Sequence, residues 1–443
     1  MDISQFLLCT FVAAPGLAFL GLALTWLLGH ELSERAITRV TQVAMAISGL
    51  SFLALFGLLV SADQGLEAKV NLGEWFRVHE YSFPLVLFVD WLSLPLVGLT
   101  VLLTAVIGAF SVTYMHRETG FLRFFLLLNL YSFGALLVLT AGSFDLLIGG
   151  WELVGISSVM LIGFFENRTG PVRNAIRVFA TYRACDVGLL VGTFLMHHFA
   201  STATYAELLT PPKLTGPAAL MVAALLVLAA SGKSAQLPFS GWLPRAMEGP
   251  TPSSAVVYGA ISVHLGAYLL LRAEPILMAA PWVAGSVVVI GATSAIYGTL
   301  AGRTCSDVKA GLAFSALSQL GLIFVEIGLG WSTLALVHIL GHATVRTLQF
   351  LRAPSMLHDY HQLQSAAGGA LPQTGGQFEA WLPPGWRLWL YRFSMDRGHL
   401  DSLVDRGFAN PLHAVSGWVG APTRLLRRLA TPAPSALPKK RLD

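Results

Sequence analysis

The feature that most constrains this chain is a series of eleven apolar segments, each long enough to cross a lipid bilayer as a helix of about 20 residues. The segments fall at residues 5–28, 41–62, 86–114, 121–140, 144–165, 175–199, 217–240, 252–272, 276–299, 311–330 and 332–352. Charged residues make up only 12% of the 443 residues. A water-facing surface usually needs roughly twice that share. The sequence therefore predicts an all-α, polytopic membrane helix bundle with eleven transmembrane helices, one of them broken.

Composition also excludes several classes of protein. With 26 Phe and 11 Trp the chain is too apolar to be disordered, and three cysteines in or beside apolar stretches do not make a disulfide scaffold. A net charge of +4, unevenly placed, does not indicate nucleic-acid binding. No P-loop, dinucleotide fingerprint or nucleophile elbow occurs, so we expect no enzyme activity and no catalytic residue in this chain. The first segment lacks a preceding basic residue, so we expect a membrane span there and not a cleaved signal peptide.

The basic residues predict how the spans are oriented, because cytoplasmic loops carry more Lys and Arg than loops on the other side. Loops and span ends after the odd-numbered spans hold ten such residues, against four after the even-numbered spans. The ten are Arg35, Arg39, Arg117, Arg123, Arg168, Arg173, Arg177, Arg245, Arg303 and Lys309, and the four are Lys69, Arg77, Lys213 and Arg272. We therefore expect the N-terminus outside and the C-terminal tail in the cytoplasm.

The chain is expected to divide into three parts. Residues 1–84 would hold the N-terminal spans and an outer loop, residues 85–352 a channel core, and residues 353–443 a cytoplasmic tail. In the tail, residues 385–404 mix apolar and charged side chains after two prolines, which predicts an amphipathic helix on a membrane surface or against a partner. The basic stretch 424–441 is expected to be frayed or lipid-associated. A simply solvated tail is the alternative; four tryptophans favour an interface: Trp381, Trp386, Trp389 and Trp418.

A single lysine, Lys233, falls inside an apolar span, where a charge costs about 2.5–3.5 kcal/mol on insertion scales. It opens the string KSAQLPFSGWLPRAMEGPTP, in which Pro238, Pro244, Pro250 and Pro252 follow within twenty residues. Because proline breaks a helix, we expect a broken span that ends in a polar cavity. A lysine there can take up and release protons; the alternatives are a side chain that snorkels to the interface and a fixed ion pair.

Carboxylates in neighbouring spans are candidate partners for this lysine. Glu152 lies inside the span 144–165 and should face the protein interior. Arg183 and Asp186 lie three residues apart in the next span, on one helix face. The Arg183–Asp186 pair is either part of a polar path or a pair of fixed charges that holds neighbouring helices together.

The last span carries His338, His342 and Arg346 at successive spacings of four residues, so all three lie along one stripe. Two histidines at this spacing can bind zinc, but the H-E-x-x-H pattern is absent and no cysteine is near in sequence. A proton relay, a metal site and hydrogen-bonded core histidines stay open as interpretations. We favour the relay and predict no metal in this chain.

Further polar groups occur at membrane depth. His264 and Tyr258 lie in the span 252–272, and Glu326, near the end of span 311–330, is expected at a channel mouth. Polar residues strung through a bundle mark an ion or proton path. The members of the predicted path come from four spans: Glu152, Lys233, His264, His338, His342 and Arg346, with Tyr258 lining it.

Four stretches carry a resemblance to known membrane proteins. They are KSAQLPFSGWLPRAMEGPTPSSA at 233–255, FVDWLSLP at 88–95, GWELVGISS at 150–158 and DVKAGLAFSALSQLG at 307–321. Together they resemble the antiporter-like membrane subunits of respiratory complex I (NuoL-type) and of Mrp-type cation/proton antiporters. The resemblance implies that Glu152 and Lys233 are the paired charges of a proton path. It also implies that the helix with His338 and His342 is the family's central histidine helix.

Two positions depart from the family pattern. Tyr258 stands where the family has the histidine of T-P-x-S-A-x-x-H, and Arg346 stands where it has the lysine of H-x-x-x-H-x-x-x-K. Because arginine does not give up its proton in a protein, Arg346 is expected to be a fixed charge.

One branch of the family is similar to this chain at these two positions and in the stretches 254–272 and 346–363. This branch is the DabB membrane subunits of DAB-type inorganic-carbon accumulation complexes. This likeness implies a bacterial inner-membrane location and a cytoplasmic partner like DabA, a zinc protein that resembles a β-carbonic anhydrase. Any zinc would then be held by the partner, with no cofactor in this chain. The leading hypothesis is a subunit that conducts protons, or Na⁺, to drive carbon uptake. The alternative is a proton-translocating subunit of a complex I-like or antiporter assembly.

Overall fold

The computed structural model describes residues 2–61, 65–78, 81–210, 212–366, 381–399 and 406. Each of the eleven predicted spans is a helix long and apolar enough to cross a membrane. These are α1 (Ile3–Leu27), α2 (Glu34–Ser61), α3 (Ser93–Tyr114), α4 (Phe121–Thr140), α5 (Phe144–Ile162), α6 (Thr169–Ala200), α8 (Gly216–Lys233), the composite helix Thr251–Arg272, α13 (Pro281–Gly302), α14 (Val308–Gly328) and α15 (Ser332–Ala366). The predicted membrane helix bundle is confirmed.

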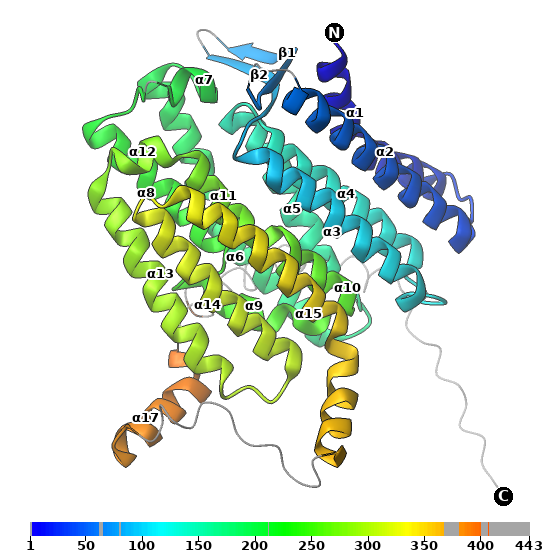
Figure 1. The fold of residues 1–443 in the computed structure, drawn as a ribbon, viewed down its shortest axis with the longest axis vertical. Coiled ribbons are helices and arrows are strands. Elements are labelled where there is room, and N and C mark those ends of the chain that lie inside the picture. Colours follow the sequence, from blue (N-terminus) through cyan, green and yellow to red (C-terminus); the bar gives the residue numbers. More distant parts are fainter. Residues whose placement is uncertain are drawn as a thin grey trace, which may run out of the picture.

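One end of the bundle carries a β-hairpin that the sequence analysis did not predict. β1 (Ala68–Val78) pairs antiparallel with β2 (Tyr81–Val89), and the short helix α7 (Tyr205–Leu208) lies at the same end (Figure 1). The expectation that the third span begins at residue 86 is therefore wrong, because α3 begins at Ser93. A short apolar run cannot be assigned to a strand or a helix by its periodicity alone. Because the apolar strand β2 comes directly before the apolar helix α3, the two were joined into one predicted span.

The predicted break in the seventh span is confirmed, but it comes earlier than expected. α8 ends at Lys233 and not at residue 240, and Ala235 adopts a left-handed conformation with φ of 54°. Three short turns follow: η1 (Phe239–Gly241), α9 (Trp242–Arg245) and η2 (Ala246–Glu248). The prolines in this stretch prevent a regular helix, so the backbone is irregular inside the bundle.

The composite helix Thr251–Arg272 lies at the centre of the bundle, and every residue of its apolar window is buried. It is not uniform: α10 (Thr251–Ser254) continues into a π-helical turn η3 (Ala255–Ala260), a 3₁₀ turn η4 (Ser262–His264) and α11 (Leu265–Arg272). π-turns inside α-helices are frequent at functional sites. α12 (Glu274–Met278) then leads into α13.

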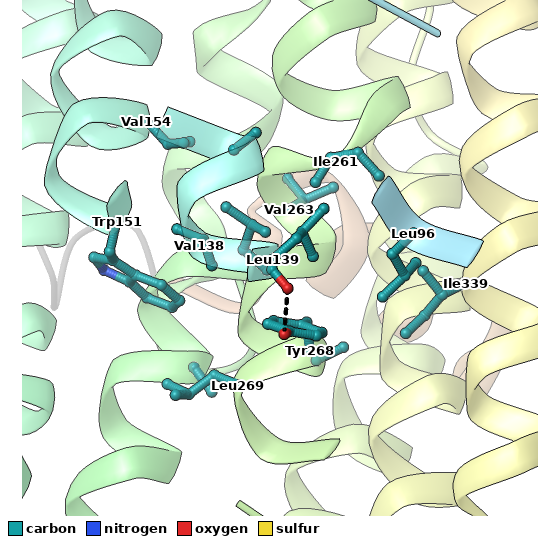
Figure 2. Close-up of a cluster of buried hydrophobic side chains, with 14 of the residues drawn as sticks. Leu96, Val138, Leu139, Trp151, Val154, Ile261, Val263, Tyr268, Leu269 and Ile339 are labelled. Atoms are coloured by element: carbon teal, nitrogen blue, oxygen red, sulfur yellow. Dashed lines mark hydrogen bonds between the residues drawn. The ribbon is translucent and has the colours of Figure 1, made fainter. Parts of the chain in front are cut away.

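The core is built by apolar side chains of the helices around this centre. Figure 2 shows the Tyr268 hydroxyl donating to the Leu139 carbonyl at 3.0 Å within this core. The labelled residues come from α3, α4, α5, the central composite helix and α15: Leu96, Val138, Leu139, Trp151, Val154, Ile261, Val263, Tyr268, Leu269 and Ile339. Because its hydroxyl is hydrogen-bonded, Tyr268 can be fully buried without leaving a polar group unpaired.

Close contact between α6 and α8 depends on a glycine. A Cβ atom added at Gly188 would overlap the backbone carbonyl oxygen of Leu225 in α8, which cannot move aside as a side chain could. We expect Gly188→Ala to lower stability by about 1–3 kcal/mol, the usual cost of overpacking. Thermal unfolding in detergent measures this. Gly149→Ala in α5 is the control, since nothing lies within 4 Å of its added Cβ. Equal stability of both variants would contradict the prediction.

The predicted tail is described only in part. α15 continues past residue 352 as far as Ala366, and α17 (Pro384–Met395) and η5 (Arg397–His399) cover the predicted amphipathic helix 385–404 as far as residue 399. The rest of that helix, Trp418 and the basic stretch 424–441 lie outside the described residues.

Candidate functional site

Lys233 ends α8 with its side chain buried at 1% exposure. Its Nζ donates to the Trp151 carbonyl oxygen at 3.2 Å and lies 4.9 Å and 4.7 Å from the ring centroids of Trp151 and Tyr182. Aromatic faces stabilise a cation without fixing it in an ion pair. The alternative of a side chain that snorkels to the interface is not what the structure shows, because the ammonium group is buried against aromatic rings.

The carboxylates near Lys233 are bound by an arginine. Arg183 forms ion pairs with Glu152 of α5 and with Asp186, whose Oδ2 lies 2.7 Å from its Nη2. The Trp151 indole donates to the other Asp186 oxygen at 2.6 Å. The direct partner of Glu152 is thus Arg183, so the expectation that Glu152 pairs directly with Lys233 is corrected. Lys233 is linked to Arg183, Glu152 and Asp186 through Trp151, and these five residues are called the lysine cluster below.

A hydrogen bond from the Ser234 side chain places the lysine cluster beside the central helix. Ser234, next to Lys233, donates to the Val263 carbonyl at 2.7 Å, and Val263 precedes His264. His264 Nε2 and His342 Nδ1 are 2.8 Å apart, with both side chains buried. In such a pair one nitrogen donates and the other accepts, so the two rings share one proton. His342 Nε2 is buried without a hydrogen-bond partner among the described residues.

His338 extends this row along α15. Its ring centroid is 6.4 Å from that of His342. Its Nδ1 is 2.9 Å from Glu326 Oε1 and its Nε2 is 3.0 Å from Gln319 Oε1, both on α14. Both ring nitrogens of His338 are therefore hydrogen-bonded to side chains of α14. Glu326 and Gln319 are thus partners that the sequence analysis did not assign to His338.

The two departures from the family pattern lie at the edges of these clusters. The Tyr258 hydroxyl donates to the Ala246 carbonyl at 3.0 Å. Its ring reaches the lysine cluster through Trp242, with centroids 6.0 Å apart. Arg346 donates to the Ser315 hydroxyl at 3.0 Å and forms no ion pair within the part of the chain that the structure describes. Neither side chain contacts the His264–His342 pair by a hydrogen bond among the described residues.

A second buried ion pair was missed by the sequence analysis. Arg272 donates to both oxygens of Asp90, at 2.6 Å and 2.9 Å, and ties the end of the central helix to the turn after β2. Burial by itself raises the pKa of Asp90, but the bonds and charge of Arg272 and the Ser93 N–H outweigh it, so the pKa lies below the usual 3.8. The signal was Asp90 in an otherwise apolar string, where a charge needs a partner.

Metal binding finds no support in the arrangement of side chains. Across the described ranges, no three or more His, Cys, Asp or Glu side chains are grouped so as to hold a metal ion. The histidines are instead placed for hydrogen bonding to each other and to α14.

Comparison with known proteins adds to the geometry. Residues 141–368 match the family "NADH:quinone oxidoreductase/Mrp antiporter, TM", and residues 75–125 match the N-terminal region of "NADH-Ubiquinone oxidoreductase (complex I), chain 5". The chain is 36% identical over 291 residues to NADH-quinone oxidoreductase subunit L of Campylobacter jejuni, covering 66% of this chain and 48% of that protein. It is 34% identical over 296 residues to NADH-ubiquinone oxidoreductase chain 5 of Schizophyllum commune, covering 67% and 43%.

Solved structures agree with the fold. The Mrp complex of Dietzia sp. contains a chain with a TM-score of 0.66 and 27% identity, covering 77% of this chain and 37% of that one. An archaeal membrane-bound sulfane sulfur reductase gives a TM-score of 0.68 at 17% identity, covering 78% and 70%, which bears on the fold alone. The chain spans about half the length of the curated relatives reported above. It is a multi-pass membrane protein that belongs to the NADH:quinone oxidoreductase/Mrp antiporter transmembrane family.

Proposed function

We propose that this chain is a proton-translocating membrane subunit of a complex I-like or Mrp-type assembly. The observation that carries the proposal is the buried Lys233 ammonium, which is held by one carbonyl and two aromatic faces while the nearby carboxylates are bound to Arg183. The names of the relatives support an assembly with other subunits. The names of these relatives favour the complex I-like or antiporter assembly, which was the alternative in the sequence analysis, over inorganic-carbon uptake.

The division of roles between the two basic residues follows from their chemistry. A lysine can lose its proton in a protein interior, whereas a guanidinium keeps its charge. Arg183 would therefore hold Glu152 and Asp186 in place through every step, and Lys233 would be the group that changes protonation. A lysine with a single hydrogen bond loses little when its proton leaves.

The histidine row supplies the continuation of this path. His264 and His342 share one proton, and His338 lies one helical turn from His342 with the Glu326 carboxylate beside it. A proton that reaches one end of such a row can be released from the other after each ring turns or a water bridges the gap. The hydrogen bond from the Ser234 hydroxyl to the Val263 carbonyl brings Lys233 next to the start of the row.

The proposal is tested by ion movement in vesicles. The chain is purified through a tag with the subunits that accompany it and is reconstituted with a pH-sensitive dye inside. A potassium diffusion potential then drives ions across the membrane. We expect proton uptake, measured in parallel with a sodium-sensitive dye to decide between H⁺ and Na⁺. An intact assembly that moves neither ion would contradict the proposal.

His342→Gln is expected to slow proton movement about 100-fold, the lower end of the range for loss of one proton-transfer group. Glutamine can keep a hydrogen bond to His264 but cannot take up a proton. The vesicle assay measures the rate. His198→Gln is a control, because His198 is exposed on α6 and lies outside both clusters. A normal rate in His342→Gln would remove the histidines from the path.

Inorganic-carbon uptake stays a second candidate because of the stretches 254–272 and 346–363, with Tyr258 and Arg346 in place of the family's histidine and lysine. It would require a DabA-like zinc partner on the cytoplasmic face. The discriminating experiment is uptake of labelled inorganic carbon in cells without carbonic anhydrase, with and without a protonophore. Uptake that the protonophore abolishes would favour this candidate. No uptake by an assembled complex would leave the complex I-like or Mrp-type assembly.

The orientation also stays a proposal. The count of basic loop residues supports an N-terminus outside and a cytoplasmic end that includes α17, in a bacterial inner membrane. The basic residues Arg168, Arg245 and Lys309 then lie at the cytoplasmic end, opposite the hairpin.

A further inference from the structure

α17 lies beyond the end of α13, at the end of the molecule opposite the hairpin, and it is angled away from the direction of the spans (Figure 1). It is attached through the turn that follows it. The Tyr297 hydroxyl of α13 donates to the Arg397 carbonyl at 3.3 Å, and the Arg397 guanidinium lies 5.6 Å from the centroid of the Phe314 ring of α14. These two contacts attach α17 to the bundle through the turn at its C-terminal end.

The side that faces the bundle and the side that faces away differ in chemistry. Ser394 is buried at 4% exposure, and Leu390 and Phe393 beside it are half-buried. On the opposite side Leu388, Tyr391 and Met395 are 51%, 55% and 57% exposed. At about 100° per residue these three form one continuous apolar stripe. A soluble surface would not favour such a stripe, and nothing in the described chain covers it.

Two arginines border this stripe. By the same helical geometry, Arg387 lies along one edge of it and Arg392 along the other, and both are exposed. Trp389 and Trp386 continue the exposed surface beyond Arg392, at 54% and 61% exposure. An apolar stripe with a long basic side chain on each edge matches a helix lying in a membrane surface. Its apolar residues enter the headgroup boundary while the arginines reach phosphates on either side.

The charge around the helix fits the same surface. Arg303, in the turn between α13 and α14, and Arg397 add to Arg387 and Arg392, against two acidic neighbours, Asp307 and Asp396. The net charge of these six described residues is positive, and this end of the bundle is the one whose basic loops predict the cytoplasmic side. The cytoplasmic leaflet carries anionic lipids that attract basic segments.

We propose that α17 is an in-plane anchor that binds the anionic phospholipid surface beside α13 and α14. Leu388, Tyr391 and Met395 insert at the headgroup boundary, and Arg387 and Arg392 contact lipid phosphates. At about 1 kcal/mol for each arginine near an anionic surface, the pair shifts the balance between the inserted and water-exposed positions about 30-fold. This proposal does not depend on ion conduction, because its test measures the position of a side chain.

The test uses the full chain in nanodiscs of phosphatidylcholine, with or without phosphatidylglycerol. Cys9 and Cys305 are replaced by serine, and a nitroxide is attached to Tyr391→Cys. Its collision rates with oxygen, which partitions into lipid, and with a water-soluble nickel complex report its position. A second label at Ile296→Cys, on the exposed lipid-facing side of α13, must be oxygen-accessible in every disc and so verifies insertion.

We expect the label on α17 to be oxygen-accessible and nickel-protected in anionic discs, and to move toward water in Arg387→Gln/Arg392→Gln. The control Arg35→Gln/Arg39→Gln removes two exposed arginines from α2 and should change nothing. A label that is nickel-accessible in both lipids would overturn the proposal. So would a label shielded from both probes, because protein and not lipid would then cover the stripe.

Discussion

Lys233→Arg is expected to abolish proton movement, by 100-fold or more, while the assembled protein stays intact. The arginine keeps a positive charge under the faces of Trp151 and Tyr182, so it still occupies the aromatic enclosure. It cannot release its proton, so the step that depends on deprotonation stops. Loss of one transfer group alone costs roughly 10²–10⁴-fold in catalysis.

The measurement separates transport from assembly. Proton uptake is followed in vesicles, and assembly is followed by co-purification of the accompanying subunits and by thermal unfolding. Lys233→Ala should also stop transport, whereas Lys213→Ala, at an exposed loop position, should not. If Lys233→Arg conducts normally, the lysine is a structural charge and the proposed path is wrong. If it fails to assemble, Lys233→Met, of similar length and without charge, distinguishes a folding defect from a transport defect.

Arg272→Ala is expected to destabilise the protein by about 3–5 kcal/mol, the usual cost of removing one partner from a buried ion pair. The Asp90 and Arg272 side chains are only 10% and 6% exposed, so the remaining carboxylate would be left without a counter-charge. Thermal unfolding in detergent measures the change. Arg77→Gln, which breaks an exposed pair with Glu74 on the hairpin, should leave the unfolding midpoint nearly unchanged.

A double variant and the pH dependence distinguish this explanation from simple loss of packing. Asp90→Leu/Arg272→Met removes both charges and should recover most of the stability, since an apolar pair often replaces a buried ion pair well. The pKa of Asp90 is lowered in the folded state. Its contribution is therefore complete above the usual value of 3.8 and is lost only as the pH falls through the lower folded-state pKa. A contribution of this pair that declines between pH 7 and pH 5 would contradict the assignment.

Helix positions were predictable because a lipid-facing helix must be apolar along its whole length, and this property can be read from consecutive residues. The break after Lys233 was predictable for a similar reason, since several prolines in a short stretch cannot continue a helix. The hairpin was not, because its second strand has the same apolar composition as the start of a span. Only the pairing of Ala68–Val78 with Tyr81–Val89, a contact between two segments, shows that it is a strand.

The candidate site divides in the same way. The sequence identified Lys233, Glu152, Arg183 and Asp186 as charges that need partners in a membrane, but it could not say which carboxylate each base would meet. Pairing depends on how α5, α6 and α8 are rotated against one another, and this is set by side-chain packing and by close contacts such as that at Gly188. The tertiary structure assigns Glu152 to Arg183 and leaves Lys233 with aromatic rings.

The sequence by itself determined that this protein spans the membrane many times, where one span breaks, and which family it resembles. Each of these follows from local composition or from matching strings of residues. Only the tertiary structure decided that His264 meets His342, that His338 meets Glu326, and that Asp90 meets Arg272. The physical reason is that a hydrogen bond or ion pair requires two groups within about 3 Å, and residues 78 or 182 positions apart in the chain reach that distance only through the packing of helices.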